Sequence, residues 1–316
     1  MSQHIRNCLF VLLSLLLLMS LSCSSPKARE TKSPIEITDQ LGRVVKLDKI
    51  PQRIISLAPS NTEILFALGL SDKLIAVTNY CDYPPEAKTK PSIGGFTTPN
   101  IEKLVALSPD LVLATSMHEK TIIPQLEQWG LAVFALAPKT LDEVLESITL
   151  VGEVMGTGKN ASELVAEMRK RIKAVTDKTN SLPEDERPTV LYLTWHDPLM
   201  TSGVGTLHNE LIQKAGGRNI FPEVIGTQSV DLESIVARNP QVMIAGVGMA
   251  AGEDKTFQYL KAESRLQNTE AGKNDRIYKI DMHLTGRAGP RIVDGLEQFA
   301  RCIHREIFGP PGPDNT

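Results

Sequence analysis

Three histidines carry the side chains that could most directly bind a metal ion. His118, His196 and His283 each follow a predicted strand, and imidazole is a common ligand of zinc and manganese. None of them has a partner at the H-x-x-x-H spacing, and no acidic residue is obviously shared among them. A polar histidine in a loop is the commoner case. We therefore predict no protein-built metal site, and keep a carrier of free zinc or manganese as a less favoured alternative.

Motifs for catalysis are largely missing from the chain. Residues 155–160, Met-Gly-Thr-Gly-Lys-Asn, look like a phosphate-binding loop, but Glu153 stands where its first glycine belongs and Asn160 replaces Ser or Thr. No G-x-S-x-G motif occurs. We predict that the protein is not an enzyme and has no catalytic cofactor. A formal net charge of −3, without a Lys/Arg-rich run, also argues against nucleic acid as a partner.

Aromatic residues fall in several predicted loops at the carboxyl ends of strands, where open α/β sheets bind ligands. Tyr80 and Phe96 belong to the first half of the chain, and Trp195 belongs to the second. Aromatic rings that face one another across a cleft suit a large, partly apolar ligand. Trp129, on a helix just before Gly130, is expected in the core instead. The candidate loops are 59–61, 80–83, 94–96, 115–118, 195–197 and 283–287.

The elements that must position these loops alternate between strand and helix, which predicts an α/β fold with parallel sheets. Residues 35–47 first predict a hairpin, and a strand-free stretch over 140–180 is broken by Gly156-Thr157-Gly158 into two helices. We predict an N-terminal lobe over 35–155, a linking helix over 156–182 and a C-terminal lobe over 183–316. The expected strands are 53–57, 73–78, 111–114, 132–136 and 189–193, and the expected early helices are 62–70, 101–107 and 122–129.

An internal repeat indicates that the two lobes share one architecture. Residues 100–114 match residues 231–245 without a gap, at a constant offset of 131, with five identical positions. The whole chain, 316 residues long, has room for two domains of ordinary size. An ungapped match at domain-sized spacing is strong evidence of a duplicated unit.

The repeat places one acidic residue at the same point in each lobe. Asn100 and Asp231 are good N-caps, and Glu102 and Glu233 then fall in the first helical turn, where the helix dipole favours an anion. Capping and the dipole explain these residues sufficiently by themselves. Alternatively, two exposed carboxylates at equivalent places could dock into two basic pockets of a two-fold symmetric partner.

The N-terminal 22 residues predict a secretory signal peptide. Its apolar core, Cys8 to Leu21, spans about 14 residues, whereas a membrane-spanning helix needs roughly 20. Cys23 follows small residues as in a bacterial lipobox, although Ser20 stands where such boxes usually have Leu, so an ordinary signal peptide cut nearby is the alternative. We predict that Cys23 is lipidated and that residues 23–34 tether the protein to a membrane outside the cytoplasm. Cys81 and Cys302 then remain, either as one disulfide or as two buried thiols.

Six segments together resemble the cobalamin and iron-siderophore group of ABC-importer solute-binding proteins, and within it the corrinoid binders most. The longest are residues 53–63, Arg-Ile-Ile-Ser-Leu-Ala-Pro-Ser-Asn-Thr-Glu, and residues 79–84, Asn-Tyr-Cys-Asp-Tyr-Pro. The resemblance covers nearly the whole chain after the tether. It departs from the group at Phe96 and Thr115, where Trp is frequent, and at Ala215, where a Cys is familiar. The other segments are 109–112, 201–203, 215–217 and 287–291.

The resemblance implies two Rossmann-like lobes joined by one long helix, the class III arrangement, with little closure because a helix bends less easily than strands. It also implies that Glu102 and Glu233 dock on arginines of a dimeric ABC permease. We expect a monomer that carries a corrinoid such as cobalamin, with a ferric siderophore or haem as the alternative ligand. The resemblance implies that the cleft is lined by Tyr80, Phe96, Trp195 or His196, and Arg287. From the loop after the first expected strand we add Pro59, Ser60 and Asn61 as candidate ligand-binding residues.

Overall fold

The computed structural model describes residues 35–248 and 254–316. The predicted signal peptide, Cys23 and the predicted tether lie outside the described residues. All the described residues belong to one compact unit of the chain. No helix within these ranges has the length and apolar character needed to cross a membrane.

The predicted N-terminal hairpin is present. Strands β1 (Ile35–Thr38) and β2 (Val44–Leu47) pair antiparallel, with Ile35 opposite Leu47. The turn is held by the buried carboxylate of Asp39, which accepts hydrogen bonds from the backbone N–H groups of Leu41 and Arg43. The same carboxylate accepts a bond from the Ala135 N–H at 3.1 Å, so the hairpin is fixed to the first sheet.

The first sheet is parallel throughout, as the alternation of elements predicts. Its strand order is β4-β3-β5-β6, so the chain starts near the middle and builds outward on both sides. A connection between parallel neighbours needs a crossover, and helices supply it here. The strands are β3 (Ile54–Ser56), β4 (Leu74–Ala76), β5 (Leu111–Thr115) and β6 (Val133–Leu136). The helices are α2 (Pro59–Ala67), α3 (Ile101–Ala106) and α4 (Ile122–Gln128), with 3-10 turns at Ser71–Lys73, Pro85–Thr89 and Ser116–His118.

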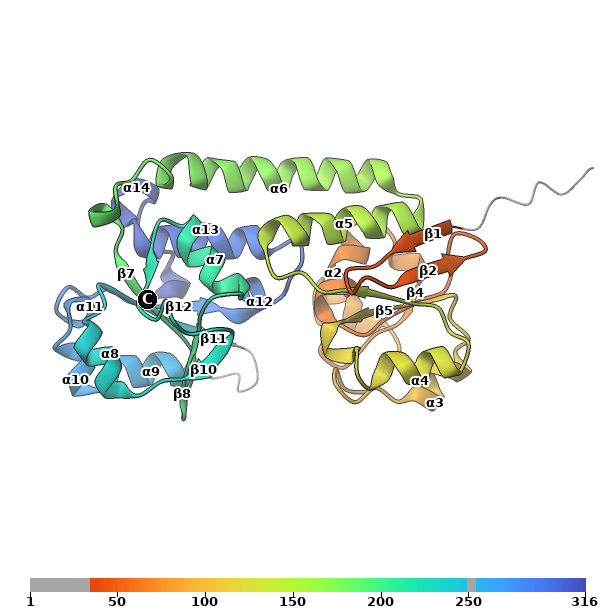
Figure 1. Ribbon diagram of the computed structural model, residues 1–316, viewed down its shortest axis with the longest axis horizontal. Coiled ribbons are helices and arrows are strands. Elements are labelled where there is room, and N and C mark those ends of the chain that lie inside the picture. The colour runs from red at the N-terminus through yellow and green to blue at the C-terminus, as the bar shows by residue number, and fades with distance from the viewer. Residues whose placement is uncertain (1–34, 249–253) are drawn as a thin grey trace, which may run out of the picture. The chain divides into compact units, whose positions relative to one another are not determined.

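Two consecutive helices follow the first sheet at the predicted place (Figure 1). Helix α5 (Leu141–Met155) begins at a capping box between Thr140 and Glu143 and ends at Gly156, whose φ of +68° is the left-handed conformation that glycine adopts freely. Helix α6 (Gly158–Thr179) then runs back along α5 and packs against α13 (Ile292–Ile303) of the second half. A Cβ atom on Gly152 would collide with the Ala161 side chain, so the two helices need glycine at this position to approach closely.

The second sheet differs from the prediction because it is mixed. Strands β7, β9, β11 and β12 are mutually parallel, but β8 and β10 run antiparallel to their neighbours. Only two residues, Asp197 and Pro198, separate β7 from β8, and so short a connection can join only antiparallel strands. The strands are β7 (Thr189–His196), β8 (Leu199–Ser202), β9 (Arg218–Asn219), β10 (Thr227–Ser229), β11 (Val242–Val247) and β12 (Ile277–Asp281).

Helices of the second half cover this sheet. Helix α13 contacts α6 and α7, and one buried cluster passes through α5, α6 and α13 from the first half of the chain to the second. The helices are α7 (Leu207–Lys214), α8 (Leu232–Arg238), α9 (Lys255–Ala262), α10 (Ser264–Gln267), α11 (Glu270–Lys273), α12 (Met282–Thr285), α13 (Ile292–Ile303) and α14 (Arg305–Phe308). Further 3-10 turns cover Glu184–Glu186 and Pro313–Asn315. We call the elements up to α5 the N-terminal lobe and those from β7 onward the C-terminal lobe.

The sequence repeat corresponds to a repeat in structure. Helices α3 and α8 begin 131 residues apart, and strands β5 and β11 that follow them begin at the same offset. Each of these strands lies between two parallel neighbours, β5 between β3 and β6 and β11 between β7 and β12. The equivalent residues Ser108 and Asn239 even share a left-handed backbone, with φ of +47° and +45°. The repeat predicted over residues 100–114 and 231–245 is therefore confirmed as one helix–strand unit that occurs in both halves.

Candidate functional site

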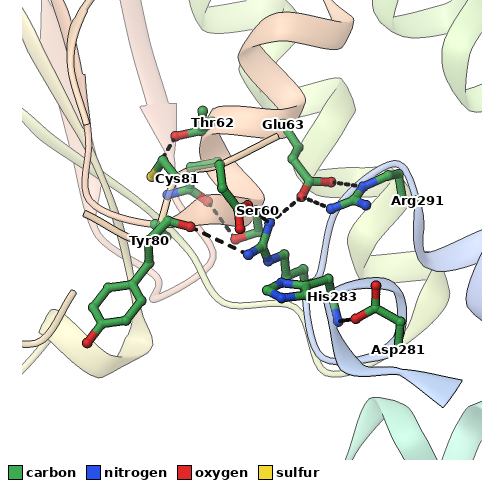
Figure 2. Close-up of polar contacts among 12 residues, drawn as sticks. Ser60, Thr62, Glu63, Tyr80, Cys81, Asp281, His283 and Arg291 are labelled. Atoms are coloured by element: carbon green, nitrogen blue, oxygen red, sulfur yellow. Dashed lines mark hydrogen bonds and ion pairs between the residues drawn. The ribbon is translucent and has the colours of Figure 1, made fainter. Parts of the chain in front are cut away.

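A buried network of charged residues joins the two lobes (Figure 2). Glu63, on α2, has a side chain only 2% exposed, and it accepts bonds from two arginines that lie between α12 and α13. Arg291 donates from Nε at 2.9 Å and from a terminal nitrogen at 2.6 Å, and Arg287 donates at 3.1 Å. The paired contact of Arg291 is the two-pronged geometry that suits a carboxylate.

A second carboxylate completes the balance of charge. Asp82 accepts a bond of 2.6 Å from Arg287, whose side chain is 7% exposed. Partial burial works against the ionised form of Asp82, but the hydrogen bond and charge of Arg287 outweigh it and lower the pKa of Asp82. The guanidinium of Arg291 also stacks over the Tyr83 ring, 3.8 Å from its centroid. The buried guanidinium of Arg287 and the partly buried one of Arg291 therefore face two carboxylates, and each charge of the network has a partner.

Pro59, Ser60 and Asn61 do not form the predicted loop. They make the first turn of α2, because Pro59 is well suited to the first helical position. The Asn61 amide is buried and donates to the Ala114 carbonyl at 2.9 Å, so its side chain is engaged within the fold. Ser60 lies at the lobe contact, since a Cβ atom on Gly289 would be 3.4 Å from the Ser60 carbonyl oxygen.

Tyr80 and Phe96 lie at the edge of the first sheet in different states of exposure. Tyr80 is 60% exposed, and its backbone carbonyl lies 3.5 Å from a guanidinium nitrogen of Arg287 in the other lobe. Phe96 is half-buried and meets the ring of His118 edge to face, with 5.1 Å between the centroids. The Tyr80 ring is therefore open to solvent beside the point where the lobes meet.

His118 is a structural residue rather than a free loop histidine. Its Nδ1 accepts a hydrogen bond from the Thr115 N–H at 3.0 Å, and its Nε2 lies 2.8 Å from the Phe96 carbonyl oxygen. Burial lowers the pKa of this imidazole. With both nitrogens engaged, His118 holds the Phe96 loop against the end of β5.

Trp195 and His196 end strand β7 instead of lying in the loop after it. The indole N–H of Trp195 donates to the Asp197 carbonyl at 2.7 Å, and its ring lies 5.2 Å from the His196 ring. His196 Nδ1 is buried without a hydrogen-bond partner. The hairpin turn at 197–198 extends β7 beyond the predicted strand end, which is why the two residues remain in the sheet.

His283 lies in the first turn of α12, after strand β12. Its backbone N–H donates to Asp281 at 2.8 Å, and its Nδ1 is buried without a partner, like that of His196 (Figure 2). His196 is the last residue of β7 and His283 comes just after β12. These two parallel strands belong to one sheet, with β11 between them. Over residues 35–248 and 254–316, no three side chains of His, Cys, Asp or Glu gather in a way that could hold a metal ion.

The two remaining cysteines are free and buried. Cys81 Sγ lies 3.2 Å from the Thr62 hydroxyl and 3.3 Å from the Thr78 hydroxyl. Burial raises the pKa of the Cys302 thiol to about 12, so it stays protonated. Of the two alternatives that the sequence leaves open, the structure has the thiols.

The repeat residues Glu102 and Glu233 are both exposed in the first turns of α3 and α8. Asn100 accepts a bond from the Lys103 N–H at 2.8 Å, and Asp231 accepts one from the Ser234 N–H at 2.7 Å, which confirms the predicted N-caps.

The sequence reasoning missed the partners of Arg287 and misplaced one tryptophan. Glu63, Asp82 and Arg291 all lie inside segments that carry the family resemblance, but nothing in their spacing indicates that they meet. Trp129, which was expected in the core, is 64% exposed. Trp129 is the C-cap residue of the short helix α4.

Known proteins resemble this chain over most of its length. The YvrC protein of Bacillus subtilis (strain 168), named an uncharacterized ABC transporter substrate-binding lipoprotein, is 32% identical over 293 residues, 90% of either chain. The crystal structure of the periplasmic vitamin B12 binding protein BtuF of Vibrio cholerae has a TM-score of 0.67 and 29% identity, covering 80% of this chain and 97% of that one. The structure of the periplasmic heme-binding protein RhuT from Roseiflexus sp. RS-1, in apo form, has a TM-score of 0.71 and 25% identity, covering 80% of this chain and 98% of that one.

These likenesses confirm the predicted fold class, two Rossmann-like α/β lobes joined by the long helix α6. The periplasmic binding protein model matches residues 54–284, which include both sheets, α6 and the two carboxylates of the charged network. The relatives are solute-binding proteins and not enzymes. The chain therefore belongs to the periplasmic binding protein family.

Proposed function

We propose that the protein captures a corrinoid, such as cobalamin, in a cleft between its lobes and delivers it to a dimeric ABC permease. The observation that carries this proposal is the open ring of Tyr80 beside the interlobe network. A large exposed aromatic ring at a lobe contact offers a flat apolar surface to a ligand. The similarity to a vitamin B12 binding protein supports the same ligand class.

The charge balance of the network favours a ligand without strong negative charge. Arg287 and Arg291 are already neutralised by Glu63 and Asp82, so a carboxylate-bearing ligand such as haem would have to displace an internal partner. The amide groups on a corrinoid ring do not need a free cation. This argument favours a corrinoid over haem or an anionic siderophore chelate.

The ligand-contacting surface that we propose draws on both lobes. Tyr80, Phe96 and Trp195 would supply the apolar contacts, while His196 and His283 would present their unpartnered nitrogens to polar groups. Asn61 would contribute indirectly, by holding the first turn of α2 against Ala114, because its side chain is buried. The remaining proposed residues are Pro59, Ser60 and Arg287 at the lobe contact.

Delivery requires a membrane location and a partner. We propose that residues 1–22 direct export, that Cys23 carries the lipid anchor and that the protein works as a monomer outside the cytoplasm. The relative from Bacillus subtilis is named a lipoprotein, which supports this arrangement. Glu102 and Glu233 would be the contacts with two equivalent basic sites on the permease dimer.

The two tryptophans of the chain allow a direct test of the ligand. In a Trp129→Phe variant the fluorescence comes from Trp195 alone, and the matched Trp195→Phe variant keeps only the exposed Trp129. Titration with cyanocobalamin should quench Trp195 to saturation at one equivalent. The matched variant should show only the attenuation caused by absorbance of the ligand.

Haemin and a ferric siderophore are titrated in parallel. Saturable quenching by either of them, with none by cyanocobalamin, would replace the corrinoid by that ligand. If none of the three changes Trp195 emission beyond the matched control, and calorimetry shows no heat of binding, the proposed capture of a large chelate is wrong.

A further inference from the structure

The two repeat glutamates have different neighbours although their positions are equivalent. Glu102 and Glu233 each follow the first residue of a helix, α3 or α8, behind an N-cap of the same kind. Across the part of the chain that the structure describes, Glu102 forms no ion pair. Glu233 instead accepts a hydrogen bond of 2.8 Å from a terminal nitrogen of Arg265.

Arg265 is held in place for this contact by a second carboxylate. Its Nε donates to Glu263 at 3.0 Å, and its backbone N–H donates to the same oxygen at 3.1 Å, because Glu263 caps the short helix α10. The Arg265 side chain is 52% exposed and that of Glu233 is 75% exposed. Both therefore lie on a surface that a partner can reach, and the guanidinium is oriented before any partner arrives.

A basic side chain of a partner would meet different electrostatic surroundings at Glu102 and at Glu233. At Glu102, within the described residues, it would find a carboxylate without an ion-pair partner. At Glu233 it would share the carboxylate with Arg265 and would be repelled by that guanidinium at a distance well within the screening length of about 8 Å in physiological salt. A two-fold symmetric partner offers the same basic site to both.

We propose, on the basis of the docking function proposed above, that Glu102 makes the stronger docking contact and that Arg265 weakens the contact of Glu233. The binding protein thus presents unequal halves to a symmetric membrane partner. A partner that fits would place a basic side chain over Glu102. Over the C-terminal lobe it would place a basic side chain together with a hydrogen-bond acceptor for the Arg265 guanidinium.

Binding of the mature protein to its own permease dimer, purified from the source membranes and reconstituted in nanodiscs, tests this asymmetry. Glu102→Gln should weaken binding about tenfold, and Glu233→Gln should weaken it about two- to fivefold. Arg265→Gln should tighten binding about two- to fivefold, and this gain should vanish when Glu233→Gln is also present. Lys170→Gln, which removes one charge from an exposed pair on α6, is the matched control and should leave binding unchanged.

Different failures have different meanings. Equal losses for Glu102→Gln and Glu233→Gln, with no effect of Arg265→Gln, would overturn the asymmetry and leave docking intact. A gain from Arg265→Gln that persists beside Glu233→Gln would also overturn it, because the effect would not pass through Glu233. If Glu102→Arg combined with Glu233→Arg leaves binding unchanged, the docking function itself is wrong.

Discussion

Removing the central carboxylate of the interlobe network should destabilise the whole chain. Glu63→Gln keeps the shape of the side chain but leaves Arg291 without its anion and Arg287 with Asp82 alone. Breaking a buried ion pair by removing one partner costs about 3–5 kcal/mol, and we expect the lower end because Asp82 and the stacked Tyr83 ring remain. About 3 kcal/mol corresponds to a fall in melting temperature of roughly 4–6 °C for a chain of this size.

Differential scanning calorimetry measures this fall directly. The matched control is Glu127→Gln, which removes a carboxylate from an exposed pair with Arg43 and should cost less than about 1 kcal/mol. A second control, Glu210→Gln, weakens another contact between the lobes, where that carboxylate accepts the Leu141 N–H at 2.7 Å. If Glu63→Gln melts within about 1 °C of the parent protein, the network does not hold the lobes together and the reasoning is refuted.

Three further predictions use the exposed ring, a buried histidine and the second carboxylate. Tyr80→Ala should weaken cyanocobalamin binding at least about tenfold by calorimetry, whereas loss of the exposed Trp129 ring should not. Burial lowers the pKa of His208 to about 4, so its neutral form stabilises the fold above pH 6.5 and this contribution is lost as the pH falls toward 4. Between pH 6.5 and pH 4, the free energy of unfolding of His208→Gln should therefore fall less than that of the parent protein. If the free energies of the two proteins fall in parallel with pH, the lowered pKa of His208 is wrong. Asp82→Asn should leave Arg287 with only the Glu63 carboxylate that it shares with Arg291, and should raise the affinity for haemin relative to cyanocobalamin; an unchanged ratio would show that the network does not select by charge.

Local signals in the sequence were sufficient to predict the repeat, its helix caps, the N-terminal hairpin and the break between the two long helices. The N-caps Asn100 and Asp231, the hairpin and the break between α5 and α6 all depend on residues within a few positions of one another. The interlobe network depends instead on residues far apart, with Glu63 and Arg287 separated by 224 positions. No periodicity links such residues, so only the fold brings them together.

The errors at the binding loops have the same origin. Whether Trp195 lies in a loop or a strand depends on the pairing of β7 with β8, and this pairing follows from the short turn at 197–198. His118 looked like an available ligand because its bond to the Phe96 carbonyl crosses 22 positions of the chain. The sequence shows which side chains could bind a ligand. It does not show which of them already have hydrogen-bond partners within the fold.

The distribution of charge connects the fold to the proposed choice of ligand. Each lobe contributes only one sign to the network, carboxylates from the N-terminal lobe and guanidinium groups from the C-terminal lobe. Because the network is neutral without a ligand, the lobes can be held in register before capture, and a ligand needs no charge to bring them together. We propose that such a site would gain affinity from apolar area and from hydrogen bonds to His196 and His283, whose buried Nδ1 atoms have no protein partner. A broad ring with neutral amide groups at its rim would satisfy both requirements, whereas a ring with carboxylates would also need a cation, and Arg287 and Arg291 are already paired.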